Sequence, residues 1–283
     1  MSVAQLPVAA VIGSPIQQSL SPAIFRAAFA DAGRDWGYIG IEVGIETIGQ
    51  TVSEAIAKNF IGLSVTMPLK EAIIDSLDEV DPVAQTLRAV NSVRINNGHT
   101  YGFNTDGDGC CDALVAQGHV TISGAHAIVL GAGGTARSVA LALVRRGASV
   151  RMINRTLKNV ERAVELVRSY PESNTGDIEV GDESAFGDAS IIVNCTSVGM
   201  ATTGVSPINV ERIRRDAVVM DAVYQPLHTE LLQTAKTHGC TVVDGLWMLI
   251  YQAMRQHEAW CGTVPDVSVM RTAAKQELSR REQ

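Results

Sequence analysis

A glycine-rich turn between an apolar run and a helical pattern constrains the fold of this chain more than any other feature. The run AIVL ends at Leu130, the turn GAGGTA covers 131–136, and the helical pattern continues through Val144. Further apolar runs follow at SVRMIN, ASIIVNCTS, AVVMDAV and TVVDG, with helical patterns between the first of them. Continuous apolar strands joined by amphipathic helices are typical of a parallel sheet covered on both faces. We therefore predict a doubly wound α/β domain here.

The residues before this domain alternate in a similar way. Strand patterns occur at VAAVIG, YIGIEV and IGLSVTM, and Asn96-Asn97-Gly98 separates two β-rich runs in the manner of a hairpin. After VVDGL the pattern is helical only, at WMLIYQAMRQHEAW and VSVMRTAAKQEL. We predict a second, smaller α/β unit, against which the C-terminal helices pack.

The turn itself has the spacing of a dinucleotide-binding site. Gly131, Gly133 and Ala136 match G-x-G-x-x-G/A after a strand and at the start of a helix. Glycines let the backbone approach a pyrophosphate, and the helix N-terminus supplies free N–H groups. A glycine turn without a ligand is the alternative. The candidate cofactor-binding residues of this turn are Gly131, Ala132, Gly133, Gly134 and Thr135.

The end of the second strand indicates which dinucleotide binds. An NAD site commonly places an acid here, on the ribose 2′-hydroxyl, but this strand ends in Asn154. Arg155, Thr156 and Lys158 follow and offer cationic and hydroxyl donors to a 2′-phosphate. NADP(H) is therefore favoured, with NAD at lower preference. A helix capped by Thr156 beside a solvated arginine is the alternative.

Composition excludes several other classes of protein. The chain has 283 residues, a net charge of -7 and no basic run, so neither nucleic acid nor a membrane surface is an expected partner. Its five cysteines lack a C-x-x-C spacing and its six histidines have no metal-ligand spacing, so we expect no disulfide framework and no metal site. We read no targeting signal and expect a cytoplasmic protein.

A series of motifs identifies the substrate class by resemblance. GSPIQQSLSP, SVTMPLK, AVNSV, GFNTDGDG, GAGGTAR, NRT, NCTSVGM, DAVYQP and DGLWMLIYQA occur in this order between about residue 8 and residue 270. In content and order they resemble the shikimate dehydrogenase family. The resemblance implies NADP-dependent, reversible reduction of 3-dehydroshikimate to shikimate in aromatic amino acid biosynthesis. The expected partner is the small-molecule substrate, and the protein is expected to be a monomer or homodimer.

The resemblance also implies a catalytic pair, Lys70 and Asp106. A lysine ammonium polarises a carbonyl and gives it a proton as hydride arrives, while a carboxylate holds the same hydroxyl. Taken without the family, Lys70 is a solvated charge after a strand and Asp106 a helix cap.

Uncharged polar residues are the implied contacts to the ring and to the nicotinamide. A polyhydroxylated ring acid needs several donors and acceptors, whereas the alternative roles of these residues are helix capping, turns and amphipathic positions. Ser21-Pro22 in particular has the pattern of an N-cap followed by proline. The implied substrate contacts are Ser19, Ser21, Thr66, Asn91, Tyr224 and Gln252, and the implied nicotinamide contacts are Thr196, Ala222 and Gly245.

The chain departs from the family pattern at a few positions. Gln18 and Phe25-Arg26 replace histidine and His-Asn, Ser64 stands where asparagine is commoner, and Asn159 replaces a second arginine. These changes keep quinate and aminoshikimate open as substrates, and also a paralogue that binds without turnover. The resemblance implies a substrate domain of 1–105 with 245–283 and a Rossmann NADP domain of 106–244, with a cleft between them.

Overall fold

Two six-stranded sheets organise the part of the chain that this computed structural model describes, residues 6–171, 176–200 and 204–281. The described residues up to Thr105, together with those from Ala253 onward, form one unit, and Asp106–Gln252 form the other. The first boundary between the units lies between Thr105 and Asp106. The second lies inside a helix, after residue 245. The two units are called the N-terminal unit and the central unit below.

The sheet of the central unit is parallel throughout, as predicted. Its strand order is β12-β11-β10-β7-β8-β9, the doubly wound order in which the chain reverses direction beside the first strand. Ligands of such sheets bind beyond the carboxyl ends of the strands at that point, between β7 and β10. The strands are β7 His126–Leu130, β8 Ser149–Ile153, β9 Asp177–Val180, β10 Ile191–Asn194, β11 Val218–Asp221 and β12 Thr241–Val243.

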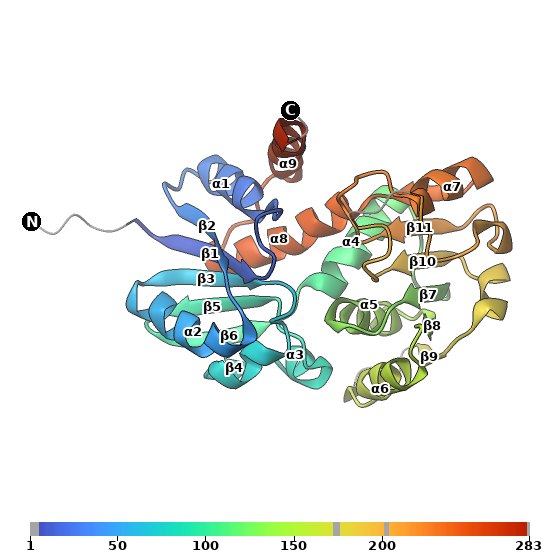
Figure 1. Cartoon of the computed structure of the whole chain (residues 1–283), viewed down its shortest axis with the longest axis horizontal. Coiled ribbons are helices and arrows are strands. Elements are labelled where there is room, and N and C mark those ends of the chain that lie inside the picture. Colours follow the sequence, from blue (N-terminus) through green and yellow to red (C-terminus); the bar gives the residue numbers. More distant parts are fainter. Residues whose placement is uncertain (1–5, 172–175, 201–203, 282–283) are drawn as a thin grey trace, which may run out of the picture. The chain divides into compact units, whose positions relative to one another are not determined.

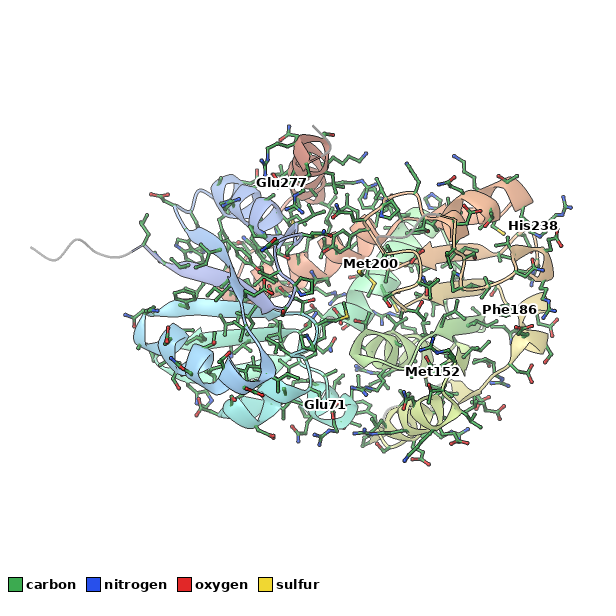
Figure 2. The ribbon with its side chains drawn as sticks, viewed as in Figure 1. Glu71, Met152, Phe186, Met200, His238 and Glu277 are labelled. Atoms are coloured by element: carbon green, nitrogen blue, oxygen red, sulfur yellow. The ribbon has the colours of Figure 1, made fainter. Side chains whose placement is uncertain are left out.

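Helices cover the central sheet. The apolar face of α6 buries Val160, Ala163, Val164 and Val167. Side chains fill the space between sheet and helices, and Figure 2 labels Met152 and Phe186 within this unit, both of them buried. The helices are α4 Asp106–Gly118, α5 Gly134–Arg145, α6 Leu157–Arg168 and α7 Glu230–His238, with short 3-10 turns η4 Glu183–Gly187 and η5 Val210–Arg212.

The sheet of the N-terminal unit is mixed. Its order is β2-β1-β3-β5-β6-β4, with β1 parallel to both β2 and β3 and with β5 antiparallel to β3. The predicted hairpin joins β5 to β6, and its turn residues Asn97 and Gly98 both have positive φ, 50° and 80°. The strands are β1 Val8–Gly13, β2 Gly37–Glu42, β3 Phe60–Val65, β4 Glu79–Val80, β5 Ser92–Asn96 and β6 His99–Phe103.

Two C-terminal helices contribute to this unit, as the strand-free pattern predicted. α9 (Val267–Arg281) packs beside α1 (Ser21–Asp31), which Figure 1 shows. At the end of α8 (Gly245–Cys261), the Trp260 indole N–H donates to the Val93 carbonyl over 3.0 Å. A Cβ atom on Gly62 would lie 2.4 Å from the Trp260 ring, so glycine is required at that contact. The remaining helices are α2 Ile48–Ala57, α3 Pro82–Leu87, η1 Ile45–Thr47 and η2 Ala72–Ser76.

Within the described ranges, no helix has both the length and the apolar character needed to cross a membrane.

Candidate functional site

One edge of the N-terminal sheet collects most of the predicted substrate residues. The segment after β1 carries Ser19 and Ser21, and the segment after β3 carries Thr66 and Lys70. Because β5 runs antiparallel to β3, Asn91, which immediately precedes β5, lies at the same edge. Parallel neighbours and one antiparallel strand therefore bring together residues that are far apart in the sequence.

Backbone hydrogen bonds fix the loops at this edge to one another. Thr66 N donates to the Ile12 carbonyl over 3.0 Å, and Val65 N donates to the Asn91 carbonyl over 2.8 Å. The carbonyl of Lys70 accepts from Val90 N at 2.8 Å, which places the backbone of Lys70 beside the start of β5. The Lys70 side chain is partly exposed. Lys70 is a cation, whereas the other predicted substrate residues at this edge are uncharged.

The sequence assigned Ser21 an alternative role as an N-cap, and this assignment is wrong. Leu20 is the N-cap residue of α1, and Ser21 is the first helical residue, followed by proline. The Ser19 hydroxyl oxygen accepts from Ser21 N over 3.3 Å, so Ser19 supplies the local bond instead. The Ser21 side chain is buried, and Ser19 is partly exposed.

A buried network of hydrogen bonds contacts Asn91. The Asn91 side-chain amide donates to Thr105 Oγ1 over 2.9 Å, and Thr105 N donates back to Asn91 Oδ1 over 2.9 Å. Gln256 Nε2 donates to the Asn91 carbonyl over 3.3 Å. Ser64 Oγ donates to Gln256 Oε1 over 2.5 Å and accepts from the Tyr38 hydroxyl over 2.6 Å. Each residue of this network is less than 10% exposed, so the network holds Asn91 from within the core.

Neither Tyr38 nor Gln256 was among the residues predicted from the sequence for this role. Burial raises the pKa of Tyr38 well above its ordinary value of 10, so its hydroxyl stays a hydrogen-bond donor. The available signal was Ser64, which departs from the family pattern, together with a glutamine four residues after Gln252 on the same helix. A polar residue at a buried helical position requires a partner, and Ser64 is that partner.

The glycine turn of the central unit has the geometry that a pyrophosphate requires. Gly131 has φ +112°, a conformation that glycine adopts without strain, and a Cβ there would lie 3.3 Å from the Cys195 backbone. Gly133 is the N-cap residue of α5, and an added Cβ there would meet no described atom within 4 Å. The turn therefore places open space at the N-terminus of α5, whose first N–H groups suit an anion.

The predicted catalytic carboxylate is connected to this turn. Asp106 is the first residue of α4 and is 5% exposed. Thr135 Oγ1, from the glycine turn, donates to Asp106 Oδ2 over 3.1 Å. α4 and α5 also approach closely, because Gly107 N donates to Ser138 Oγ over 2.9 Å. A residue predicted to bind cofactor thus orients the residue predicted to act in catalysis.

The segment expected to read the 2′-phosphate is accessible. Arg155, Thr156 and Lys158 are all exposed after β8, and Asn154 Nδ2 donates to the Thr156 carbonyl over 3.1 Å. Thr156 is the N-cap residue of α6, but its side chain makes no capping hydrogen bond. The alternative was therefore right that Thr156 occupies the N-cap position of α6, but wrong that its hydroxyl caps the helix.

A second buried hydrogen-bond network, which was not predicted from the sequence, connects the carboxyl ends of β10 and β11. Asp221 is fully buried and accepts from Thr229 Oγ1 at 2.7 Å, Asn194 Nδ2 at 2.9 Å and Val223 N at 3.0 Å. Burial raises its pKa despite these bonds. Asn194 Oδ1 in turn accepts from Thr196 Oγ1 at 2.7 Å. The network sets the backbone that carries Thr196 and the residues after β11.

The other predicted contacts of the central unit lie near the end of β11 or on α8. Ala222 and Tyr224 follow β11 directly and are partly exposed. A Cβ on Gly245 would lie 2.5 Å from the Val223 carbonyl, so only glycine allows α8 to begin so close to that strand. Gln252 is buried on α8, where its side-chain amide donates to the Leu249 carbonyl over 2.8 Å.

The predicted residues thus form two groups. Ser19, Ser21, Thr66, Lys70 and Asn91 belong to the N-terminal unit, and the structure brings them to one sheet edge. Asp106, the glycine turn and the other predicted residues belong to the central unit. The first group consists of neutral polar side chains and one ammonium, and the second consists of a glycine turn at a helix N-terminus together with a carboxylate and other polar residues. No cluster of three or more potential metal ligands occurs among the described residues.

Two family models match the chain. The shikimate dehydrogenase substrate binding domain matches residues 11–93, and the shikimate 5′-dehydrogenase C-terminal domain matches residues 245–275. Shikimate dehydrogenase (NADP(+)) of Methanopyrus kandleri is 37% identical over 281 residues, which cover 97% of each chain.

Solved structures show the same likeness over nearly the whole chain. Shikimate 5-dehydrogenase from Thermus thermophilus, solved with NADP(H) and shikimate, has a TM-score of 0.87 and 36% identity, covering 96% of this chain and 99% of that one. Quinate dehydrogenase from Corynebacterium glutamicum, solved with NAD, has a TM-score of 0.86 and 29% identity, with the same coverage.

Proposed function

Because the chain belongs to the shikimate dehydrogenase family, we propose that it interconverts 3-dehydroshikimate and shikimate with NADP(H). The observation that supports the proposal is that backbone hydrogen bonds join the loops carrying Thr66, Lys70 and Asn91 at the end of the N-terminal sheet. Ser19 and Ser21 lie on the segment that follows β1 in the same unit. Neutral hydroxyl and amide groups suit the carboxylate and hydroxyls of a ring acid, and a single ammonium suits its reacting oxygen.

NADP(H), when bound, supplies or accepts the hydride. The residues present fit it, because Gly133 faces open space at a helix N-terminus and Arg155 is exposed after the neighbouring strand β8. The turn Gly131–Thr135 would hold the pyrophosphate, and Asn154, Arg155, Thr156 and Lys158 the 2′-phosphate. Thr196, Ala222 and Gly245 would line the nicotinamide.

Lys70 and Asp106 handle the proton in this proposal. Lys70 gives a proton to the C3 oxygen as that carbon is reduced, and takes it back in the reverse direction. Asp106 accepts a hydrogen bond from the same oxygen once it is a hydroxyl. Thr135 orients the Asp106 carboxylate through its 3.1 Å bond. Ser19, Ser21, Tyr224 and Gln252 belong to the proposed ring contacts, as do Thr66 and Asn91.

Domain roles and surroundings follow from the same proposal. The N-terminal unit, with its C-terminal helices, is the substrate domain, and the central unit is the NADP domain. The five cysteines, all of them among the described residues, form no disulfide, which suits the proposed cytoplasmic location. The partner is the small-molecule substrate, and the assembly is a monomer or homodimer.

A matrix of initial rates tests the proposal. Shikimate, quinate and aminoshikimate are each oxidised with NADP and with NAD, and nicotinamide absorbance is followed. We expect the highest kcat/KM with shikimate and NADP. Quinate is the second candidate substrate, because the quinate dehydrogenase named above is similar over 96% of this chain. A preference for quinate with NAD would replace the proposal, and binding without turnover of any substrate would reject it.

A further inference from the structure

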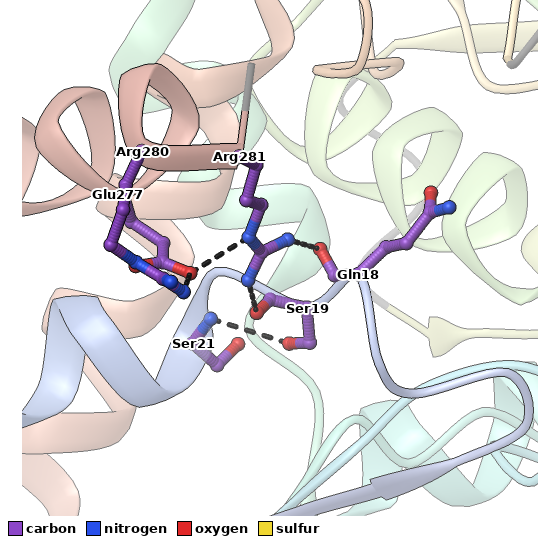
Figure 3. A network of polar contacts seen from close by, with 6 residues as sticks. All are labelled: Gln18, Ser19, Ser21, Glu277, Arg280 and Arg281. Carbon is purple, nitrogen blue, oxygen red and sulfur yellow. Dashed lines mark hydrogen bonds and ion pairs between the residues drawn. The ribbon is translucent and has the colours of Figure 1, made fainter. Parts of the chain in front are cut away.

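The guanidinium of Arg281, near the end of α9, contacts the loop that carries Ser19. Arg281 Nη1 donates to the Gln18 carbonyl over 2.7 Å, and Nη2 donates to the Ser19 carbonyl over 3.0 Å (Figure 3). More than 260 positions separate the partners in sequence. Neither carbonyl belongs to the ladder of α1, which begins where Leu20 accepts from Ile24 N.

These two bonds determine the direction of the Ser19 side chain. The Gln18 carbonyl belongs to the peptide plane before the Ser19 Cα atom, and the Ser19 carbonyl to the plane after it. Because peptide groups are planar, fixing both planes fixes φ and ψ at Ser19 and hence its Cα–Cβ bond. The Ser19 hydroxyl oxygen also accepts from Ser21 N, so the same restraint reaches Ser21.

Glu277 holds Arg281 in position. Its Oε1 accepts from Arg281 Nε over 2.8 Å, one turn earlier on α9, and the side chains of the pair are 19% and 21% exposed. Arg280 also pairs with Glu277, through Nη2 at 2.8 Å, but its side chain is 72% exposed. Arg280 therefore shares the charge and the carboxylate partner of Arg281. The structure records no bond from Arg280 to the loop among the described residues.

We propose that Arg281 is a positioning residue for substrate, acting from α9 on the main chain at Gln18 and Ser19. This inference rests on the proposed function, since it takes Ser19 and Ser21 as contacts to the ring carboxylate. Arg281 itself holds the loop in its binding conformation before substrate arrives. Such preorganisation lowers the cost of binding and affects KM more than the chemical step.

Kinetics of three variants test the proposal. We expect Arg281→Gln to raise the KM for shikimate about tenfold, the equivalent of losing a charge-assisted hydrogen bond, with a smaller change in kcat and none in the KM for NADP. Arg281→Lys keeps the charge but places its donors on one nitrogen, so its KM should fall between those of wild type and Arg281→Gln. Arg280→Gln removes the same charge from the same carboxylate and should behave as wild type. Equal effects of Arg281→Gln and Arg280→Gln, or no effect of either, would overturn the proposal.

Hydrogen exchange of the ligand-free protein supplies a readout that does not depend on the substrate. Ser19 N donates to the Ile16 carbonyl over 2.9 Å, and this amide and that of Ser21 should exchange faster in Arg281→Gln than in Arg280→Gln. Unchanged exchange would reject the positioning role. Faster exchange in a protein whose wild type does not oxidise shikimate would support the loop restraint and reject the proposed function.

Discussion

The buried hydrogen bonds that link Tyr38, Ser64 and Gln256 should contribute measurably to the stability of the N-terminal unit. Tyr38→Phe removes one hydroxyl without changing the shape of a ring that stacks on Phe25 at 4.5 Å and is 1% exposed. In this variant Ser64 still donates a hydrogen bond to Gln256, but its own oxygen no longer accepts a hydrogen bond from Tyr38. Because Ser64 is only 6% exposed, solvent does not replace that donor.

Leaving a buried acceptor without its donor costs about 1–2 kcal/mol of unfolding free energy. For a unit of this size that cost corresponds to a fall of about 3–8 °C in the unfolding midpoint. The Tyr38 pKa lies well above 10, so the hydroxyl is protonated in both neutral and mildly alkaline solution. The penalty should therefore not change between about pH 6 and pH 9.

Urea unfolding followed by tryptophan fluorescence measures this cost, because Trp260 lies in the same unit. Tyr101→Phe is the matched control within the same unit: Tyr101 is partly exposed and its hydroxyl donates to Asp81 Oδ2 at 3.4 Å, so less than about 0.5 kcal/mol should be lost. In a Ser64→Ala background, Tyr38→Phe should cost about 1 kcal/mol less. The reasoning is refuted if Tyr38→Phe costs no more than the control, or if its cost is the same with and without Ser64.

Three further outcomes concern catalysis, cofactor choice and acid stability. Lys70→Ala should lower kcat by at least about 100-fold with little change in the KM for shikimate, and near-normal turnover in steady-state assays would remove Lys70 from the mechanism. Arg155→Ala should raise the KM for NADP about tenfold or more while the KM for NAD is unchanged, and equal changes would mean that the segment does not read the phosphate. Hydrogen bonds from Arg280 and Arg281 lower the pKa of Glu277 from 4.5 to about 2, so its contribution to stability is present above about pH 4.5 and is lost as the pH falls toward 2. The difference in melting temperature between wild type and Glu277→Gln should accordingly shrink over that interval, and a constant difference would contradict the assignment.

The sequence predicted the elements that depend on local pattern. The apolar runs around Leu130 and Ile153 became parallel strands, and the glycine turn became a helix start with open space at Gly133. Of the predicted turn Asn96-Asn97-Gly98, the last two residues form the hairpin turn and Asn96 is the last residue of β5. Each of these follows from spacing or from backbone conformation within a few residues, which a single sequence contains.

Long-range polar pairing could not be predicted in the same way. Gln256 bonds to the Asn91 carbonyl across 165 positions, and Thr135 bonds to Asp106 across 29. Such partners are chosen by the packing of helices on sheets, and nothing in the local pattern names them. The predicted N-cap of α1 was wrong for a related reason. Leu20 is the N-cap residue, one position earlier than the Ser21-Pro22 pattern indicates.

The contact between Trp260 and Gly62 has a consequence for how the protein is made. A ribosome synthesises the chain from its N-terminus, so Gly62 of β3 is added about 200 residues before Trp260, at a rate of roughly 5–20 residues per second. All strands of the central unit lie in one continuous stretch of the chain, residues 106–252. The N-terminal unit, although synthesised first, lacks Trp260, Gln256 and Arg281 until residues 253–281 have emerged. Its completion is therefore the later event, and a ribosome that stalls before residue 253 would leave the apolar surface around Gly62 exposed to chaperones.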